Sequence, residues 1–216
     1  MSEQPSERPP GSLVLSPSEL RYLLAAFPSE RADSLGLLLG IEEIGDIDDA
    51  FLPGASALLA RGLLGGFDTG DLGPTGEALP VGLVLGSPSA WWALTAAIDG
   101  RPEFALVIDS PAGALLAQPG PVGVFAFTPL VEGADPRGFV VELAEGMISA
   151  EASAVLRVTG DGAEGPVVFS ARRDGTAVQY GWGLPGEDEP RELVPDGDPE
   201  TMAAAFRRLL GAAPGR

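Results

Sequence analysis

The stretch Gly54–Ile98, GASALLARGLLGGFDTGDLGPTGEALPVGLVLGSPSAWWALTAAI, marks the change from helices to strands in this chain. Its ASALLARGLL segment predicts a short helix that ends at Gly62, because glycine adopts the left-handed C′ conformation without a steric penalty. A second helix is expected to begin at Gly73 and Pro74, and Pro80 should kink or end it. The uncharged apolar run after this helix predicts buried strands.

The segment before this stretch is helical in pattern. Ser16, Pro17 and Glu19 fit a capping box, with the serine as N-cap and the proline at the first helical position. The apolar residues that follow are spaced to form one helix face: Leu20, Leu23, Leu24 and Phe27. A second short helix is predicted over residues 33–39, and it ends at Gly40.

The segment after it alternates in the manner of strands. Trp92, Leu94, Ala96 and Ile98 share one face at a period of two, and Asp99-Gly100 is a hairpin signal. A helix capped by Ser87-Pro88 is the alternative for this run. Further strands are predicted over residues 104–108, 113–117, 122–127 and 139–143, and residues 145–151 fit either a helix or a strand.

A meander and a helix close the chain. The meander covers residues 154–159, 166–173 and 176–182, with Asp174-Gly175 as the last turn, and its Val178, Tyr180 and Trp182 should face the core. After an acidic loop over 183–198, with a possible strand at 192–194, Asp198 and Pro199 predict the start of a helix. Its apolar stripe is Met202, Ala205, Phe206 and Leu209.

These patterns predict an α+β fold, an antiparallel sheet flanked by N-terminal helices and a C-terminal helix. We expect a flexible tail at residues 1–11 and a single domain over 12–216. Within that domain, residues 12–86 form the helical part. Residues 87–216 form mainly antiparallel sheet with the closing helix.

The composition restricts the function. The formal net charge of −18 opposes binding to nucleic acid and to anionic membranes, because both need cations on the protein. The N-terminus lacks a signal-peptide pattern, and the two uncharged windows at 78–98 and 110–131 fit strands better than membrane spans. We therefore expect a cytoplasmic protein without membrane insertion. The absence of lysine and asparagine is typical of a GC-rich bacterial genome.

The residue types present exclude most catalytic machinery. The chain has no histidine, cysteine or lysine, so it lacks an imidazole base, a thiolate and a Schiff-base amine. Carboxylates, arginines and hydroxyls remain. The string Gly160-Asp161-Gly162-Ala163-Glu164-Gly165 has the G-x-G-x-x-G spacing, but a strand pattern follows it, so we interpret it as a hairpin loop. The acidic segment 42–49 lacks the ligand spacing of a calcium loop. We expect no catalytic residues, no metal site and no cofactor.

One basic-aromatic group is a candidate binding site. Arg172 and Arg173 end one strand, and Tyr180 and Trp182 lie on the next. This group can receive a carboxylate or an acidic partner. A cation–π or cross-strand pair with a purely structural role is the alternative.

Four segments in order resemble one family. They are LSPSEL (Leu15–Leu20), ALLARGL (Ala57–Leu63), LGPTGEAL (Leu72–Leu79) and the closing DPETMAAAFRRLL (Asp198–Leu210). Their order is similar to that of the EspG family, cytosolic chaperones associated with type VII secretion in actinobacteria. The resemblance implies a central antiparallel sheet flanked by helices, no catalytic residues, and shielding of the helical tip of a secreted partner. The present chain is short and has few strands in its first half.

The function expected from the sequence is therefore that of a non-enzymatic, cytosolic binding protein, similar to these chaperones, with a protein partner. A small enzyme or ligand-binding domain that uses carboxylates and arginines is the alternative. A structural domain whose acidic loop makes interactions is a third. The sequence carries no signal for the oligomeric state.

Overall fold

The computed structural model describes residues 11–41, 51–66, 72–151, 153–162, 165–183 and 192–211. They belong to two compact units. The first contains the chain up to Ser87 together with Leu115–Pro129, and the second contains Pro88–Ala114 and the chain from Leu130 onward. The chain first passes from one unit to the other between Ser87 and Pro88, one residue beyond the predicted change from helices to strands. The predicted α+β class is confirmed, because helices and antiparallel strands occupy largely separate segments.

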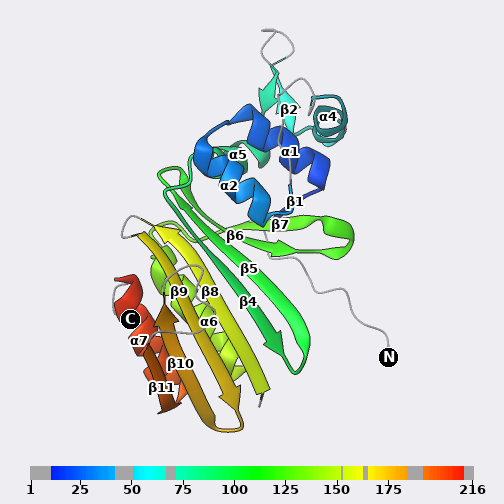
Figure 1. Ribbon diagram of the computed structural model, residues 1–216. Coiled ribbons are helices and arrows are strands. Elements are labelled where there is room, and N and C mark those ends of the chain that lie inside the picture. The colour runs from blue at the N-terminus through cyan, green and yellow to red at the C-terminus, as the bar shows by residue number, and fades with distance from the viewer. Residues whose placement is uncertain are drawn as a thin grey trace. The chain divides into compact units, whose positions relative to one another are not determined.

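The first unit is mainly helical, with two small groups of strands (Figure 1). Strand β7 lies between β1 and β6, and β2 pairs with β3, all antiparallel. A short π-helical turn covers Phe51–Ala55, and a short 3-10 turn covers Pro121–Gly123. The remaining elements are β1 (Leu13–Leu15), α1 (Pro17–Ala26), α2 (Glu30–Leu38), α4 (Ser56–Ala60), β2 (Leu64–Gly65), β3 (Gly73–Pro74), α5 (Ala78–Gly86), β6 (Gly113–Pro119) and β7 (Phe125–Pro129).

The predicted capping box at α1 is confirmed. The Glu19 carboxylate accepts a hydrogen bond from the Ser16 backbone N–H at 2.8 Å, and the Ser16 hydroxyl accepts one from the Glu19 N–H at 3.4 Å. Arg61, at the end of α4, adds a 2.6 Å ion pair to the same carboxylate and donates to the Val14 carbonyl. Glu19 therefore joins the start of α1 to α4, although it lies 4 % exposed in the core.

The pKa of Glu19 makes the stability of this unit depend on pH. Burial raises this pKa, but the hydrogen bonds from Ser16 and Arg61 together outweigh burial and hold it below its ordinary value of 4.5. Because folding favours the charged form of Glu19, this carboxylate stabilises the folded protein above pH 4.5. The stabilisation is lost as the pH falls through the lower pKa that Glu19 has in the folded protein. We expect Glu19→Gln to lower the free energy of unfolding by about 1–3 kcal/mol at pH 7.

Thermal unfolding of both proteins between pH 7 and pH 3 tests this expectation. The difference in Tm between Glu19→Gln and the wild type should shrink as the pH falls below 4.5. Glu30→Gln is the control, because Glu30 is an exposed glutamate of the same unit. A pH-independent difference would contradict the assigned role of the carboxylate.

Two predicted helix starts in the first unit are wrong. Gly73 and Pro74 form β3 and not the start of a helix, and α5 begins at Ala78. Pro80 lies in the first turn of α5, where a backbone N–H has no acceptor within the helix, so this proline neither kinks nor ends it. Helix α2 begins at Glu30, three residues before the predicted start, because the Ser29 hydroxyl caps it.

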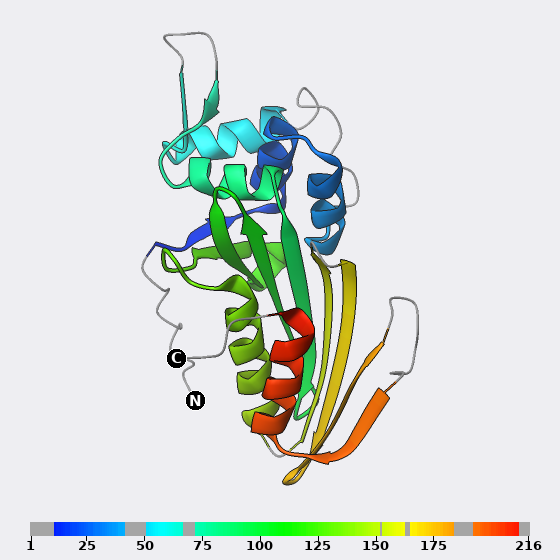
Figure 2. The same cartoon turned by 90° about the vertical axis from the view of Figure 1, so that its left-hand side faces the viewer.

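The second unit is a six-stranded antiparallel sheet with two helices. The strand order is β5-β4-β8-β9-β10-β11 (Figure 1). Helices α6 and α7 lie side by side on one face of this sheet (Figure 2). The elements are β4 (Ala90–Ile98), β5 (Arg101–Ser110), α6 (Pro136–Ser149), β8 (Ser153–Gly162), β9 (Gly165–Asp174), β10 (Ala177–Gly183), β11 (Glu192–Gly197) and α7 (Pro199–Leu210).

Helix α6 replaces the strand predicted over residues 139–143, so that prediction is wrong. Asp135 caps the helix by accepting from the Arg137 N–H at 3.1 Å, and Pro136 occupies the first position. The buried residues Val140, Val141, Ala144 and Ile148 follow helical spacing. The β-propensity of Phe-Val-Val is therefore outweighed by the Asp-Pro cap and by burial against the sheet. The helix also includes residues 145–149, where the sequence fitted either structure.

The hairpins of the second unit follow the predicted order with one shift. Asp99 and Gly100 have φ angles of 48° and 77° and form the expected tight turn between β4 and β5. Asp174 instead pairs with Ala177, so the turn between β9 and β10 is Gly175-Thr176, one residue later than predicted. The predicted strand near residue 192 is present as β11.

The covered face of this sheet holds the core of the second unit. Of the residues predicted to share one face of β4, Trp92, Leu94 and Ala96 are buried and Ile98 is half-buried. Val178 and Tyr180 are buried as predicted, whereas Trp182 is half-buried. Phe206 of α7 stacks on Phe169 of β9 with ring centroids 4.3 Å apart. The predicted cap of α7 is confirmed, and hydrogen bonds from the Thr201 N–H and hydroxyl lower the pKa of Asp198. Gly211 ends the helix with a φ of 61°.

Among the residues that the structure describes, no helix is both long enough and apolar enough to cross a bilayer.

Candidate functional site

The face of the sheet opposite α6 and α7 carries several side chains that reach solvent. Side chains alternate between the two faces along a strand. In β4, β8, β9 and β10, every second residue points into the core under the helices, and the residues that alternate with these lie on this face. Several of them are exposed: Thr95, Ala97, Val155, Arg172 and Gln179. Val155, an apolar residue among mostly polar ones, is 50 % exposed. We refer to this surface as the open face.

Strand register brings two arginines together on the open face. Arg157 of β8 is directly opposite Ser170 of β9, and Arg172 lies two residues farther along β9 on the same face. Diagonal neighbours of this kind are about 7–8 Å apart. Arg172 has Gln179 of β10 directly opposite it on one side and Val155 of β8 directly opposite it on the other. The open face therefore carries two guanidinium groups beside a hydroxyl, an amide and an apolar side chain.

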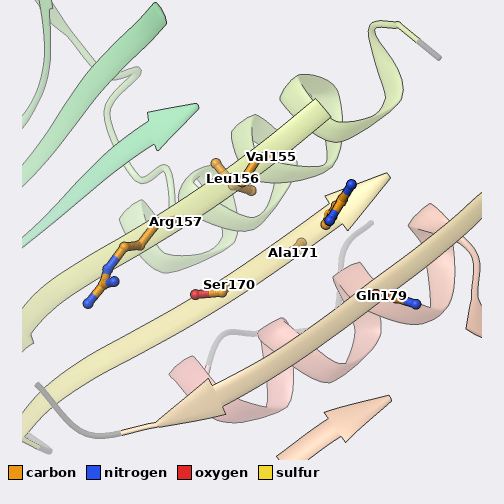
Figure 3. A pocket seen from close by; sticks show the side chains of 7 residues that line it. Val155, Leu156, Arg157, Ser170, Ala171 and Gln179 are labelled. Atoms are coloured by element: carbon orange, nitrogen blue, oxygen red, sulfur yellow. The ribbon is translucent and has the colours of Figure 1, made fainter. Parts of the chain in front are cut away.

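A shallow depression of about 280 Å³ lies between these residues. Figure 3 shows the side chains of Arg157, Ser170 and Gln179 contributed by three neighbouring strands. Within the described ranges, neither Arg157 nor Arg172 makes a hydrogen bond or an ion pair through its guanidinium. Two unpaired guanidinium groups in a protein with a net charge of −18 favour a ligand that carries carboxylates.

The structure divides the residues predicted to form the basic-aromatic group. Tyr180 is buried on the helix-covered face, 6.3 Å from the ring centre of Phe169. Arg173 lies on the same face, and it donates hydrogen bonds to the carbonyls of Ile148 and Ser149 at the end of α6. Arg172 lies on the open face. The four side chains therefore do not form one group, because adjacent residues of a strand point in opposite directions.

Arg157 is the site residue that sequence reasoning missed. It lies fifteen residues before Arg172 and becomes its neighbour only through the pairing of β8 with β9. The sequence contains the information needed to place Arg157 beside Arg172, because it predicts both strands and the short connection between them. Residues Gly162 and Gly165 pair across this connection, and that pairing sets the register.

Trp182 lines a different depression of about 360 Å³, together with Ala205, Arg208 and Leu209 of α7. A third depression, of about 300 Å³, lies beside the β4–β5 turn and contains Asp99, Arg101, Glu103 and Glu151. It has carboxylates of its own near its arginine. The open face therefore differs from both, because it combines two guanidinium groups from neighbouring strands.

The three glycines of the G-x-G-x-x-G string belong to the paired ends of β8 and β9, which form a hairpin as the sequence indicated. Gly160 pairs with Trp92 of β4, and the indole ring occupies the space that a side chain at position 160 would need. This glycine therefore serves packing and not phosphate binding. The acidic segment 42–49 lies outside the described residues. Within the described ranges, no three carboxylates gather in a group that could hold a metal ion.

The sequence matches no protein-family model, and no curated protein gives a significant match.

Proposed function

We propose that this protein is a non-enzymatic, cytoplasmic binding protein that holds a protein partner, similar to the chaperones of type VII secretion. The observation that carries the proposal is the open face, a sheet surface with an exposed valine and with two arginines that have no partner among the residues that the structure describes. Such a surface offers broad contact and no enclosed cavity, which suits a protein segment better than a small substrate.

Exposed apolar side chains of the first unit also support a partner. Leu79 and Leu83 are four residues apart on one side of α5, and each is 40 % exposed. Leu52 and Leu59 are exposed along the helical segment 51–60. A contiguous apolar patch is typical of a surface that binds another protein, and the adjacent pair Leu79 and Leu83 is the candidate for such a patch.

The positions of the carboxylates support a function without catalysis. A general acid or base among carboxylates is expected to be buried, with a perturbed pKa and free lone pairs. Among the described residues, Glu19 is the only buried carboxylate, and its oxygens are engaged by Ser16 and Arg61. Its burial therefore has a structural explanation.

A small ligand-binding domain is the second candidate. The depression at Arg157, Ser170 and Arg172 favours it, because two guanidiniums and a hydroxyl can bind a small organic acid. Its exposure to solvent argues for a weak site of this kind.

Affinity purification of the tagged protein from a lysate of its native host tests the proposal. We expect one protein in a stoichiometric amount, identified by mass spectrometry, and a complex that persists in size-exclusion chromatography. A monodisperse protein that retains no partner under these conditions would contradict the proposal. A thermal-shift screen against small organic acids would then test the second candidate.

A further inference from the structure

We propose that the open face binds an extended acidic segment of the partner, with two carboxylates of that segment held by Arg157 and Arg172. This inference rests on the proposed function and adds the chemistry of the partner. In the described part of the chain, these two guanidiniums share one face, come from neighbouring strands and make no ion pair. Arginine is the side chain best suited to paired hydrogen bonds with a carboxylate.

The spacing of the two arginines selects an extended segment. Arg157 and Arg172 are diagonal neighbours, so about 7–8 Å separates their positions. In an extended chain, side chains two residues apart lie on one side and are about 6.6 Å apart. Acidic residues at alternate positions therefore match the two guanidiniums. Val155 and Ala97 provide an apolar surface beside them for the backbone of such a segment.

The net charge of the protein makes this site specific. Because its net charge is −18, the protein as a whole repels an acidic segment, and this repulsion acts over distances longer than direct contact. An acidic segment therefore gains nothing from non-specific attraction and binds only where local cations exceed this background. Asp174 lies on the same face as Arg172, two residues away, and limits the positive potential at that end. Binding is consequently expected to be weak for an isolated peptide and to depend strongly on both arginines.

Titration of the ¹⁵N-labelled full-length protein with an alternating Glu–Ser heptapeptide tests the inference. We expect saturable shifts of the backbone amides of residues 155–157 and 170–172. Arg157→Ala and Arg172→Ala should each weaken binding by about tenfold, since each removes one charge-assisted pair. Arg101→Ala removes the same charge from an exposed position of the same unit and should leave the affinity unchanged.

Three further arms determine the chemistry. A heptapeptide of alternating Lys and Ser, which the net charge attracts without specificity, should cause no saturable shifts at residues 155–157 and 170–172. Acetate at the same carboxylate concentration should cause smaller shifts there than the Glu–Ser peptide. A heptapeptide with two adjacent glutamates should bind more weakly than the alternating one. Absence of binding by the alternating Glu–Ser peptide, or equal binding by all arginine variants, would overturn the inference. Recovery of a partner by the wild type and equally by the Arg157→Ala/Arg172→Ala protein would overturn the inference but leave the proposed function intact.

Discussion

Phe206→Ala should lower the free energy of unfolding of the second unit by about 3–5 kcal/mol, the usual loss when a buried phenylalanine is truncated. Phe206 is fully buried, and its ring stacks on Phe169 at 4.3 Å with an interplanar angle of 15°. The substitution removes this aromatic contact between α7 and the sheet and leaves a cavity next to Phe169.

Urea denaturation followed by circular dichroism measures this loss. Val131→Ala is the control, because Val131 belongs to the same unit and is 83 % exposed, so its truncation should change stability by less than about 0.5 kcal/mol. If Phe206→Ala is as stable as Val131→Ala, α7 does not pack on the sheet as described.

Gly160→Ala is expected to destabilise the second unit by about 1–3 kcal/mol, the range for overpacking a filled core. A Cβ atom at this position would overlap the indole of Trp92 and would lie 3.1 Å from the Trp91 carbonyl oxygen. Trp92 is 3 % exposed and belongs to β4, which is paired with a strand on each side, so neither the ring nor the backbone can move without disturbing the sheet.

Thermal unfolding and tryptophan emission together test this prediction. The variant should show a lower Tm and a red-shifted emission, because the displaced indole gains contact with water. Gly146→Ala is the matched control. Gly146 is an exposed residue of α6, and a Cβ there meets no atom within 4 Å, so this substitution should stabilise the helix by up to about 1 kcal/mol. Equal behaviour of the two variants would mean that Gly160 does not accommodate Trp92.

The elements with explicit end signals could be predicted from the sequence. Helix α7 begins at Asp198-Pro199 and ends at Gly211 as expected, because caps and apolar stripe specify the same helix. Helix α6 departs from the predicted strand, although Asp135-Pro136 is an equivalent helix-start signal, because the Phe-Val-Val sequence favours a strand. Helix α5 was placed too early, because a glycine followed by a proline is also compatible with a short strand.

The candidate site could be predicted only in part. Arg172 was identified, but it was grouped with Arg173, its neighbour in sequence, and not with Arg157. Strand alternation alone separates Arg172 from Arg173. Recognition of Arg157 also requires the register of β8 against β9, which depends on how the hairpin at Gly162 and Gly165 closes. The role of Arg173 at the end of α6 could not be predicted while α6 was assigned as a strand.

One measurement tests the central claim, that this is a binding protein whose open face contacts its partner. Tagged wild type, Arg157→Glu/Arg172→Glu and Arg101→Glu are used in parallel to purify partners from the native host, and the recovered protein is quantified by mass spectrometry. We predict one stoichiometric partner for the wild type and for Arg101→Glu, and at least a tenfold loss for the double variant, because it places repulsive charge at the site. Equal recovery by all three proteins, or recovery of no partner by any of them, would contradict the claim.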